Sequence, residues 1–374
     1  MAHSISLRLG HPDPTTLNTL PFQQAVQRVM TSSQAANALA YGNEQGNIAL
    51  MDYLVKRINQ EQHLNLSAEN LMITAGSTNA LDMIARLYTQ AGDAVIVEAP
   101  SYVDSLHVLR DHGVKLYAVP MDDEGMLPDE LEALLKDLAS KQIKPRLLYT
   151  IPNFHNPTGI TASEARRTAI VKLARQYDLM IVEDDVYRDL AFEANIPPSY
   201  FALAGGENVI QIGSVSKTIA PGLRVGWIVA CAEIVQRCVD CGTTQMGGGA
   251  SPLSAQIVVE FCRQGDWDTH LEHIRNLYQT RRDTMLAALD LYMPPDVTWT
   301  QPAGGFFVWL TLPENKYAAV VKRQASERGV LVASGEGFFV NPADGQHHLR
   351  LTYSFASLDD IETAVRVLAE VVSA

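Results

Sequence analysis

The sequence predicts an α/β fold, in which a large domain has a mainly parallel sheet sandwiched by helices and a smaller α+β domain follows it. Between about residues 71 and 230, short apolar runs alternate with amphipathic segments, which is typical of strands that helices cover on both faces. From residue 295 onward, strand-like runs are marked by glycine. We therefore predict a large domain at 46–290 and a small domain at 291–374, with residues 1–45 packing on the small one.

The predicted strands of the large domain are short apolar runs bounded by glycine, proline or polar residues. They cover 71–74, 94–100, 115–120, 146–153, 179–185 and 208–217. Helices are predicted between these strands. One follows Gly76, and the others span 101–113, 128–139 and 161–178. In the last of these, Thr161 and Glu164 have the spacing of a capping box. Its apolar stripe is formed by Ala169, Ile170, Leu173 and Tyr177.

The small domain is predicted to begin after a long helical stretch that ends at Pro294-Pro295. Strand-like runs then follow at 299–313, 329–340 and 347–354, with a helix after the first run and a last helix at 358–372. The N-terminal segment is assigned to this domain because so short a stretch has little core of its own.

Composition and charge exclude several classes of function. The chain has 374 residues, of which 47% are hydrophobic and 19% charged, as in ordinary soluble globular proteins. A net charge of −13 without basic blocks argues against a nucleic-acid partner. No apolar run is long enough to span a bilayer, and MAHSISLRLG at the N-terminus lacks the apolar core of a signal peptide. We expect a cytoplasmic protein with no membrane partner.

The cysteines are interpreted as core residues. Cys238 and Cys241 form a CxxC pair, which can indicate redox chemistry or a metal site. However, they recur at helical spacing with Cys231, Ile234 and Val235, and further ligands at zinc-site spacing are missing. Because cysteine often packs as a small apolar side chain, we predict one helix with these residues on its buried face and no metal.

The most informative motif is the run GSVSKTIAPGLRVGW at 213–227. Ser214 and Ser216 flank Lys217, and Arg224 follows seven positions after the lysine. This layout suits an amine that forms a Schiff base beside a bound phosphate, because hydroxyls and a guanidinium can hold the phosphate. The alternative is a surface lysine in a polar turn.

Two further strand ends carry candidate groups. Gly76, Ser77 and Thr78 open a predicted helix, whose N-terminus offers free N–H groups and a favourable dipole to a phosphate. A simple helix cap is the alternative. The run IVEDDVY at 181–187 ends a strand in carboxylates. A carboxylate beside a pyridine nitrogen would favour the protonated, charged form of that nitrogen.

Five more residues stand in short motifs: Tyr102 in APSY, Asn156 in IPNFHNPTG, Arg350 in HLRLTYS, Gly10 in LRLGHPDP and Tyr41 in LAYGNEQG. Taken singly, a tyrosine at a strand end packs, an Asn-Pro-Thr-Gly run forms a turn, and an arginine on a strand faces solvent. Because the carboxyl ends of parallel strands share one edge of a sheet, ligands bind there. The residues that follow strands are therefore predicted to meet at that edge.

In their order and spacing, these motifs resemble those of the pyridoxal-phosphate-dependent aminotransferases of fold type I, class I/II. The resemblance covers nearly the whole chain and implies the PLP-transferase fold type I with pyridoxal 5′-phosphate as cofactor. The runs EDDVYRDL, PNFHNPTG and GGFFVWLTLP look most similar to 2-aminoadipate aminotransferases and to the aminotransferase-like part of MocR-type regulators. The stretch before residue 40 is short for a DNA-binding domain, which favours the enzyme.

The resemblance also implies a role for each residue. Lys217 would be the catalytic residue, bound to the cofactor, and Arg350 would bind the substrate α-carboxylate, with Asn156 and Gly10 also lining the substrate. The cofactor would be held by Gly76, Ser77, Thr78, Tyr102, Asn156, Asp184, Tyr187, Ser214, Ser216 and Arg224. Tyr41 would reach the cofactor phosphate of the partner subunit in a homodimer with shared active sites, although IALMDYL stands where the family usually has a Leu-Arg pair.

Asp184 is preferred to its neighbour because the family places an aspartate three residues before a tyrosine, here Tyr187. Asp185 is then expected to be a helix cap or a solvated neighbour.

The function implied is transfer of an amino group between an L-amino acid and a 2-oxo acid by a ping-pong scheme. Two alternatives stay open at this stage, because fold and cofactor do not fix the reaction. One is another enzyme with the same cofactor, such as a lyase, decarboxylase or oxidase, and the other is a non-catalytic sensor. Substrate specificity is expected from residues 11–40 and from the loop 245–252, whose glycines predict mobility or close backbone approach.

Overall fold

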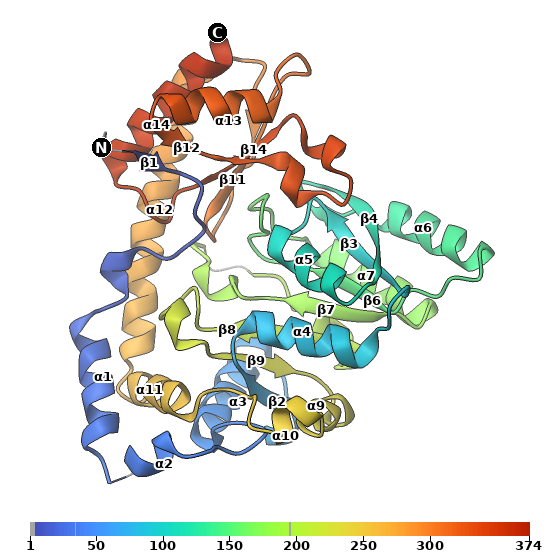
Figure 1. The fold of residues 1–374 in the computed structure, drawn as a ribbon, viewed down its shortest axis with the longest axis vertical. Coiled ribbons are helices and arrows are strands. Elements are labelled where there is room, and N and C mark those ends of the chain that lie inside the picture. The colour runs from blue at the N-terminus through green and yellow to red at the C-terminus, as the bar shows by residue number, and fades with distance from the viewer. Residues whose placement is uncertain (1–3, 34, 194–195) are drawn as a thin grey trace.

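The computed structural model describes residues 4–33, 35–193 and 196–374. An eight-stranded sheet forms the centre of the larger part, with strand order β2-β9-β8-β7-β6-β3-β4-β5 (Figure 1). Its strands are β2 (Leu71–Thr74), β3 (Ala94–Ala99), β4 (Lys115–Asp122), β5 (Gly125–Met126), β6 (Leu147–Thr150), β7 (Met180–Asp184), β8 (Val209–Ser214) and β9 (Gly226–Val229).

The middle of this sheet is parallel, since β4, β3, β6, β7 and β8 pair in parallel along the order. β9 runs antiparallel to both β8 and β2, and β5 is antiparallel to β4. The predicted α/β architecture with a mainly parallel sheet is thus confirmed. The strand β9 was not predicted, because it is only four residues long and begins within the lysine run, so it does not stand out as a separate apolar stretch.

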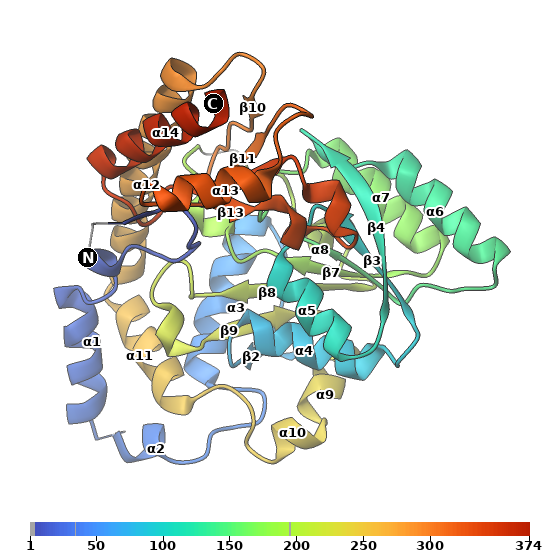
Figure 2. The ribbon, with the colours of Figure 1, turned by 45° about the horizontal axis from the view of Figure 1, so that its top comes forward.

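Helices cover both faces of the sheet. Figures 1 and 2 show α4 (Ser77–Tyr88) and α5 (Val103–Asp111) over one face and α3 (Ile48–Gln62) on the other. The remaining helices of this part are α6 (Pro128–Ser140), α7 (Glu164–Gln176), α8 (Tyr200–Leu203), α9 (Ala232–Val239), α10 (Gly242–Gln245) and α11 (Pro252–Arg263). The strands between them are buried along nearly their whole length, which accounts for their continuous apolar sequence.

The predicted start of α7 was wrong. Ser163, and not Thr161, is the N-cap, because the Ser163 side chain accepts from the backbone N–H of Arg166. The buried face holds Arg167, Ile170, Val171 and Ala174, so Ile170 is the only member of the predicted stripe that is fully covered.

The cysteine helix was also predicted too long. α9 ends at Val239, and Cys231 and Cys241 are half-buried N-cap residues of α9 and α10. Cys238 does lie on the buried face, with Ile234 and Val235. All four cysteines are free.

The C-terminal part contains a second sheet, with the order β10 (Thr298–Trp299), β11 (Phe307–Thr311), β14 (His348–Thr352) and β13 (Ala333–Ser334). The helices α13 (Ala318–Glu327) and α14 (Leu358–Ser373) accompany it, and α12 (Asp266–Tyr292) packs against α14 (Figure 1). A separate pair of strands joins β1 (Ile5–Ser6) to β12 (Val330–Leu331) in parallel.

The N-terminal segment therefore touches both parts of the chain. Its strand β1 pairs with the C-terminal part, whereas α1 (Leu20–Thr31) and α2 (Ala35–Leu39) pack on α11. The division at residues 45 and 290 stays a prediction. No helix within the described ranges combines the length and the apolar character that crossing a membrane requires.

A buried arginine fixes the loop between β6 and α7. Arg167 has no exposed surface, and its guanidinium donates to the carbonyl oxygens of Pro152, Ala162, Pro197 and Pro198 and to Asn153 Oδ1. This loop includes Asn156, so the arginine also determines where that side chain lies. Burial lowers the pKa of Arg167, and the five hydrogen bonds compensate the charge.

We predict that Arg167→Met lowers the free energy of unfolding by about 3–5 kcal/mol, because several buried acceptors lose their donor at once. Lys172→Met is the matched control, since Lys172 lies exposed on the same helix and should change the value by about 0.5 kcal/mol or less. Denaturant unfolding of both variants, followed by circular dichroism, measures the difference. Equal unfolding midpoints for the two variants would contradict the structural role of Arg167.

Candidate active site

Five of the predicted site residues lie at one edge of the central sheet. Gly76, Tyr102, Asn156 and Lys217 follow β2, β3, β6 and β8, and Asp184 is the last residue of β7. These strands all end at the same edge, since β2 and β8 are both antiparallel to β9 and the others are parallel to β8. The sheet topology therefore brings together residues that are far apart in the sequence.

The small sheet adds Arg350 to this cluster. Arg350 lies on β14, and its Nη1 donates to Asn156 Oδ1 over 2.8 Å. Asn156 also hydrogen-bonds the side chain of Tyr187. The Nζ of Lys217 lies 5.8 Å from the centroid of the Tyr187 ring. The amine, the amide, the phenol and the guanidinium thus form one group between the two sheets.

Gly76 provides a cradle at the start of α4. It has a φ of 87°, a conformation that side chains other than glycine rarely adopt, and a Cβ there would lie 2.4 Å from Arg224 Nη2. As the N-cap it has no side chain to accept from the first N–H groups of α4, which begins with Ser77 and Thr78. Arg224 crosses this turn and donates to Ala75 O over 3.3 Å. The uncapped N–H groups at the start of α4 and the Arg224 guanidinium therefore lie together at a position suited to an anion.

The two serines before Lys217 form a local hydrogen-bonded pair. Ser214 Oγ lies 2.8 Å from Ser216 Oγ and 3.1 Å from Val225 O, and it accepts from the backbone N–H of Ser216. Both serines are buried. Their hydroxyls thus lie just ahead of Lys217 in the chain and close the turn that follows β8.

The three consecutive acidic residues that begin within β7 have separate environments. Glu183 accepts from the backbone N–H groups of Tyr200 and Phe201 at the start of α8, and burial raises its pKa to about 7. Asp185 was predicted to be a cap or a solvated neighbour, and this was wrong. It is buried and accepts from Asn153, Arg188 and Gln211. The error arose because the sequence does not show that the chain beyond β7 stays covered.

Asp184 is the acidic residue that keeps an oxygen available. Its Oδ2 accepts from the Tyr149 hydroxyl over 2.7 Å, while its Oδ1 is buried and has no partner among the described residues. Burial raises the pKa of this carboxyl to about 6, against the opposing hydrogen bond from Tyr149 and the positive charge of Lys217. An ionised carboxylate in this position would favour a cation placed against Oδ1.

Lys217 has a strongly perturbed amine. Burial lowers its pKa from 10.5 to about 8, with Arg350 and Arg224 acting in the same direction and Asp184 opposing them. Its Nζ donates to Gly10 O over 3.4 Å. An amine with this pKa is partly neutral near physiological pH and can then act as a nucleophile or a base.

Arg350 is held between aromatic rings. Its guanidinium carbon lies 4.5 Å from the Phe307 ring centroid and 4.9 Å from that of Phe338. Burial lowers its pKa to about 10, so the group stays charged at neutral pH. Its Nε is buried and finds no hydrogen-bond acceptor in the described part of the chain. The side chain can therefore donate a further hydrogen bond to an anionic partner.

The segment around Gly10 crosses the site from the N-terminal side. Arg8 O accepts from Arg350 Nη2 and His11 O accepts from Ser354 Oγ, at 2.7 and 2.6 Å. A Cβ on Gly10 would lie 2.7 Å from the Phe307 ring, so close approach explains this glycine. His11 stands in the run LRLGHPDP but was not predicted as a site residue, and its pKa is lowered by burial and by the charges of Lys217 and Arg350.

Tyr102 and Tyr41 have different surroundings. The Tyr102 hydroxyl donates to Asp104 Oδ2 over 2.5 Å, and burial raises its pKa. Tyr41 is 91% exposed and lines a groove that also includes Arg224 and the loop 245–252. In that loop, a Cβ placed on Gly247 would lie 3.0 Å from the Tyr41 ring. The structure thus places Tyr41 beside the turn that carries Arg224, on an open surface.

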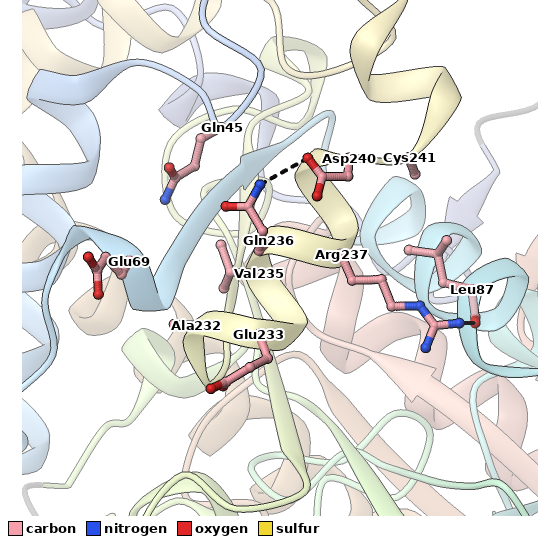
Figure 3. A pocket seen from close by; sticks show the side chains of 10 residues that line it. All are labelled: Gln45, Glu69, Leu87, Ala232, Glu233, Val235, Gln236, Arg237, Asp240 and Cys241. Carbon is pink, nitrogen blue, oxygen red and sulfur yellow. Dashed lines mark hydrogen bonds between the residues drawn. The ribbon is translucent and has the colours of Figure 1, made fainter.

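A second groove, of about 860 Å³, lies beside α9 and contains none of these residues (Figure 3). In it Gln236 bonds Asp240, and Arg237 donates to Leu87 O away from the groove centre. Its lining is Gln45, Glu69, Leu87, Ala232, Glu233, Val235, Gln236, Arg237, Asp240 and Cys241. It has neither the lysine amine nor the buried carboxylate, so the candidate active site is the cluster at the strand ends.

Comparison with known proteins assigns the family. The family description "Aminotransferase class I and II" matches residues 4–368. An aromatic-amino-acid aminotransferase of Thermococcus litoralis is 35% identical over 368 residues, which are 98% of this chain and 88% of that protein. The chain belongs to the class I and II aminotransferases.

Solved structures agree with this assignment. The kynurenine aminotransferase of Pyrococcus horikoshii, in complex with PMP, has a TM-score of 0.94 and 34% identity, and the match covers 100% of this chain and 91% of that one. The α-aminoadipate aminotransferase of Thermus thermophilus, bound to N-(5′-phosphopyridoxyl)-L-leucine, has a TM-score of 0.89 and 33% identity, with 99% and 92% covered. The protein is therefore a pyridoxal-phosphate-dependent aminotransferase, and its cofactor is pyridoxal 5′-phosphate.

The residues at the strand ends fit this cofactor. A free buried carboxylate oxygen on Asp184, an anion cradle at Gly76 and a low-pKa amine on Lys217 match the ring nitrogen, the phosphate and the aldehyde. The described residues contain no group of three acidic, histidine or cysteine side chains that could hold a metal ion.

We predict that the Lys217 amine of the cofactor-free protein reacts with acetic anhydride with a pH midpoint near 8, since burial disfavours its charged form. Competitive labelling read by mass spectrometry measures this midpoint. Asp184→Asn should move it to lower pH, because the charge that stabilises the ammonium is removed. A midpoint at the ordinary value of 10.5 would contradict the buried environment.

Proposed function

We propose that the strand-end cluster is the active site of this aminotransferase and that Lys217 is its catalytic residue. One observation supports this most strongly: a partly buried amine of lowered pKa, a buried carboxylate with a free oxygen and a buried guanidinium meet where two sheets join. Buried charges are costly, and such groups concentrate at functional sites.

The geometry supports the roles proposed for the residues that would hold the cofactor. The Gly76 turn with Ser77 and Thr78, together with Ser214, Ser216 and Arg224, would hold the phosphate. Asp184 would hold the proton of the ring nitrogen, Asn156 and Tyr187 would donate to the phenolic oxygen, and Tyr102 would cover the ring. When bound, pyridoxal phosphate supplies an aldehyde that takes up the amino group and a ring that withdraws electrons from the substrate Cα.

The chain's own residues then bind, orient and move protons. The Arg350 guanidinium binds the α-carboxylate of the amino acid in a two-pronged pair, and its aromatic neighbours Phe307 and Phe338 restrict its position. The Lys217 amine, once neutral, acts as a base and takes the proton from the Cα of the amino acid. When the 2-oxo acid is converted in the second half of the reaction, the same group acts as an acid and gives a proton to Cα. Gly10 lines the substrate with its backbone. Asn156, which bonds Arg350, connects substrate and cofactor positions.

The substrates are an L-amino acid and a 2-oxo acid. The related enzymes act on different donors, since one is named for aromatic amino acids and others for kynurenine and α-aminoadipate. A panel of these donors with 2-oxoglutarate and with pyruvate, read by formation of the new amino acid, tests the proposed function. Absence of any new amino acid with every pair, from protein that carries its cofactor, would contradict it.

We predict that Arg350→Ala raises KM for amino acids and 2-oxo acids alike, with the cofactor content unchanged. Loss of a desolvated charge pair costs about 2–5 kcal/mol in binding. Arg350→Lys keeps the positive charge but loses the two-pronged geometry. Its KM should therefore lie between that of the unmodified chain and that of Arg350→Ala. Steady-state kinetics with the best donor of the panel measures the effect. An unchanged KM in Arg350→Ala would return this arginine to a structural role.

A homodimer with shared sites is also part of the proposal. Tyr41 is almost fully exposed, and other apolar side chains beside it or near it in the chain, Leu39, Ile48 and Met246, are exposed as well. Exposed apolar surface beside the Arg224 turn suits a second copy of the chain. The proposed location is the cytoplasm, with which four free cysteines are compatible.

Sharing of sites makes a specific prediction. Tyr41→Ala and Lys217→Ala should each be severely impaired, but a co-expressed hybrid dimer should regain activity, because one of its two sites then has neither defect. Turnover of the purified hybrid, with each chain carrying a different tag, measures this. A hybrid no more active than its parents, or a fully active monomer by light scattering, would remove Tyr41 from the site.

A further inference from the structure

A chain of buried hydroxyl groups lies behind Asp184. Tyr149 on β6 has no exposed surface, and its hydroxyl lies 2.7 Å from Asp184 Oδ2. On its other side the same hydroxyl lies 2.7 Å from Ser105 Oγ, which belongs to α5 and is also buried. Neither hydroxyl belongs to a sequence motif that indicates the cofactor, and Tyr149 stands in an apolar run that predicts only a strand.

The direction of these bonds follows from counting hydrogens. A tyrosine hydroxyl has one hydrogen, and an ionised Asp184 can only accept, so the Tyr149 hydrogen points to Asp184. The Tyr149 oxygen must then accept, and Ser105 is the donor. Burial raises the pKa of Tyr149 well above its usual range, so the phenol keeps its hydrogen at every working pH. The arrangement therefore always presents a donor to Asp184 Oδ2.

Resting on the role proposed for Asp184, we propose that Tyr149, supported by Ser105, is a positioning residue that fixes the Asp184 carboxylate and keeps it ionised toward the cofactor ring nitrogen. One oxygen is held by the phenol, so the other, which is buried and has no partner in the described part of the chain, is directed to the ring. A carboxylate that ionises can hold a proton on that nitrogen, whereas a neutral acid cannot.

The surroundings of Asp184 show why such support is needed. Burial and the neighbouring charge of Asp185 both favour the neutral acid, while the hydrogen bond from Tyr149, the charge of Lys217 and the backbone N–H of Val186 favour the ionised form, Tyr149 most strongly. The phenols of Tyr102 and Tyr187 also lie close enough to interact with Asp184. When the lysine amine is neutral, its charge no longer contributes. The hydrogen bond from Tyr149 then becomes the principal contact that stabilises the carboxylate.

The test is a titration of Asp184 in the full chain freed of cofactor. Carbon-13 in the aspartate carboxyl groups gives a signal for each residue, and the signal of Asp184 is the one missing from Asp184→Asn. We expect a midpoint near 6 for the unmodified chain. In Tyr149→Phe it should rise by about 1–2 pH units, which corresponds to loss of a hydrogen bond to a charged acceptor. Ser105→Ala should shift it in the same direction and by less.

Tyr353→Phe is the matched control. Tyr353 is equally buried, and its hydroxyl donates to Gly304 O over 2.7 Å, far in the sequence from Asp184. The control should leave the Asp184 midpoint unchanged, although it also removes a buried phenol. An unchanged midpoint in Tyr149→Phe, or an equal rise in Tyr353→Phe, would overturn the proposal. If Tyr149→Phe does not fold, Ser105→Ala replaces it, and an unchanged Asp184 midpoint in that variant overturns the proposal.

The loaded enzyme provides a second readout. Tyr149→Phe should lower kcat by about tenfold or more while KM for the amino acid changes little, because Arg350 is untouched. Full turnover in Asp184→Asn would remove the proposed role of Asp184, whereas the titration would still report on the hydroxyl chain. The two failures can therefore be distinguished. A combined rise of KM with unchanged kcat in Tyr149→Phe would contradict a role through Asp184.

Discussion

The burial of a carboxylate at the end of β7 is the constraint on which the site depends. Asp184 is buried, and an uncompensated charge there would be neutralised or would destabilise the fold. Tyr149 and Lys217 provide the compensation, Tyr149 from the neighbouring strand β6 and Lys217 from the turn after β8. The parallel order of β6, β7 and β8 is what places these groups around one point. The same topology leaves one carboxylate oxygen without a partner among the described residues.

The second sheet completes the site by contributing positive charge. Arg350 stays charged although it is buried, since it contacts Asn156, the backbone of the N-terminal segment and two aromatic faces. The segment around Gly10 thus connects the two sheets, because its carbonyl groups accept from Lys217 and Arg350. Close packing of Gly10 on Phe307 allows that approach. A substrate carboxylate at Arg350 would therefore lie near the Lys217 amine.

The sequence could predict the parallel strands and the residues that follow them, because apolar runs and turn motifs are local signals. It missed β9, which is short and lies at the end of the lysine run. It misplaced Asp185, because burial after a strand depends on distant residues such as Gln211 and Asn153. It also missed Tyr149, since the partner that determines the role of this tyrosine lies on the neighbouring strand. The features that the sequence did not predict are thus mainly those that depend on contacts between residues far apart in the chain.

The most direct measurement of the proposed site is the location of the cofactor on the chain. Protein loaded with pyridoxal phosphate is reduced with borohydride, digested and mapped by mass spectrometry. The proposed site requires one phosphopyridoxyl group for each chain, on the peptide that contains Lys217. A group on any other lysine, with the Lys217 peptide unmodified, would contradict the placement of the active site at the strand ends.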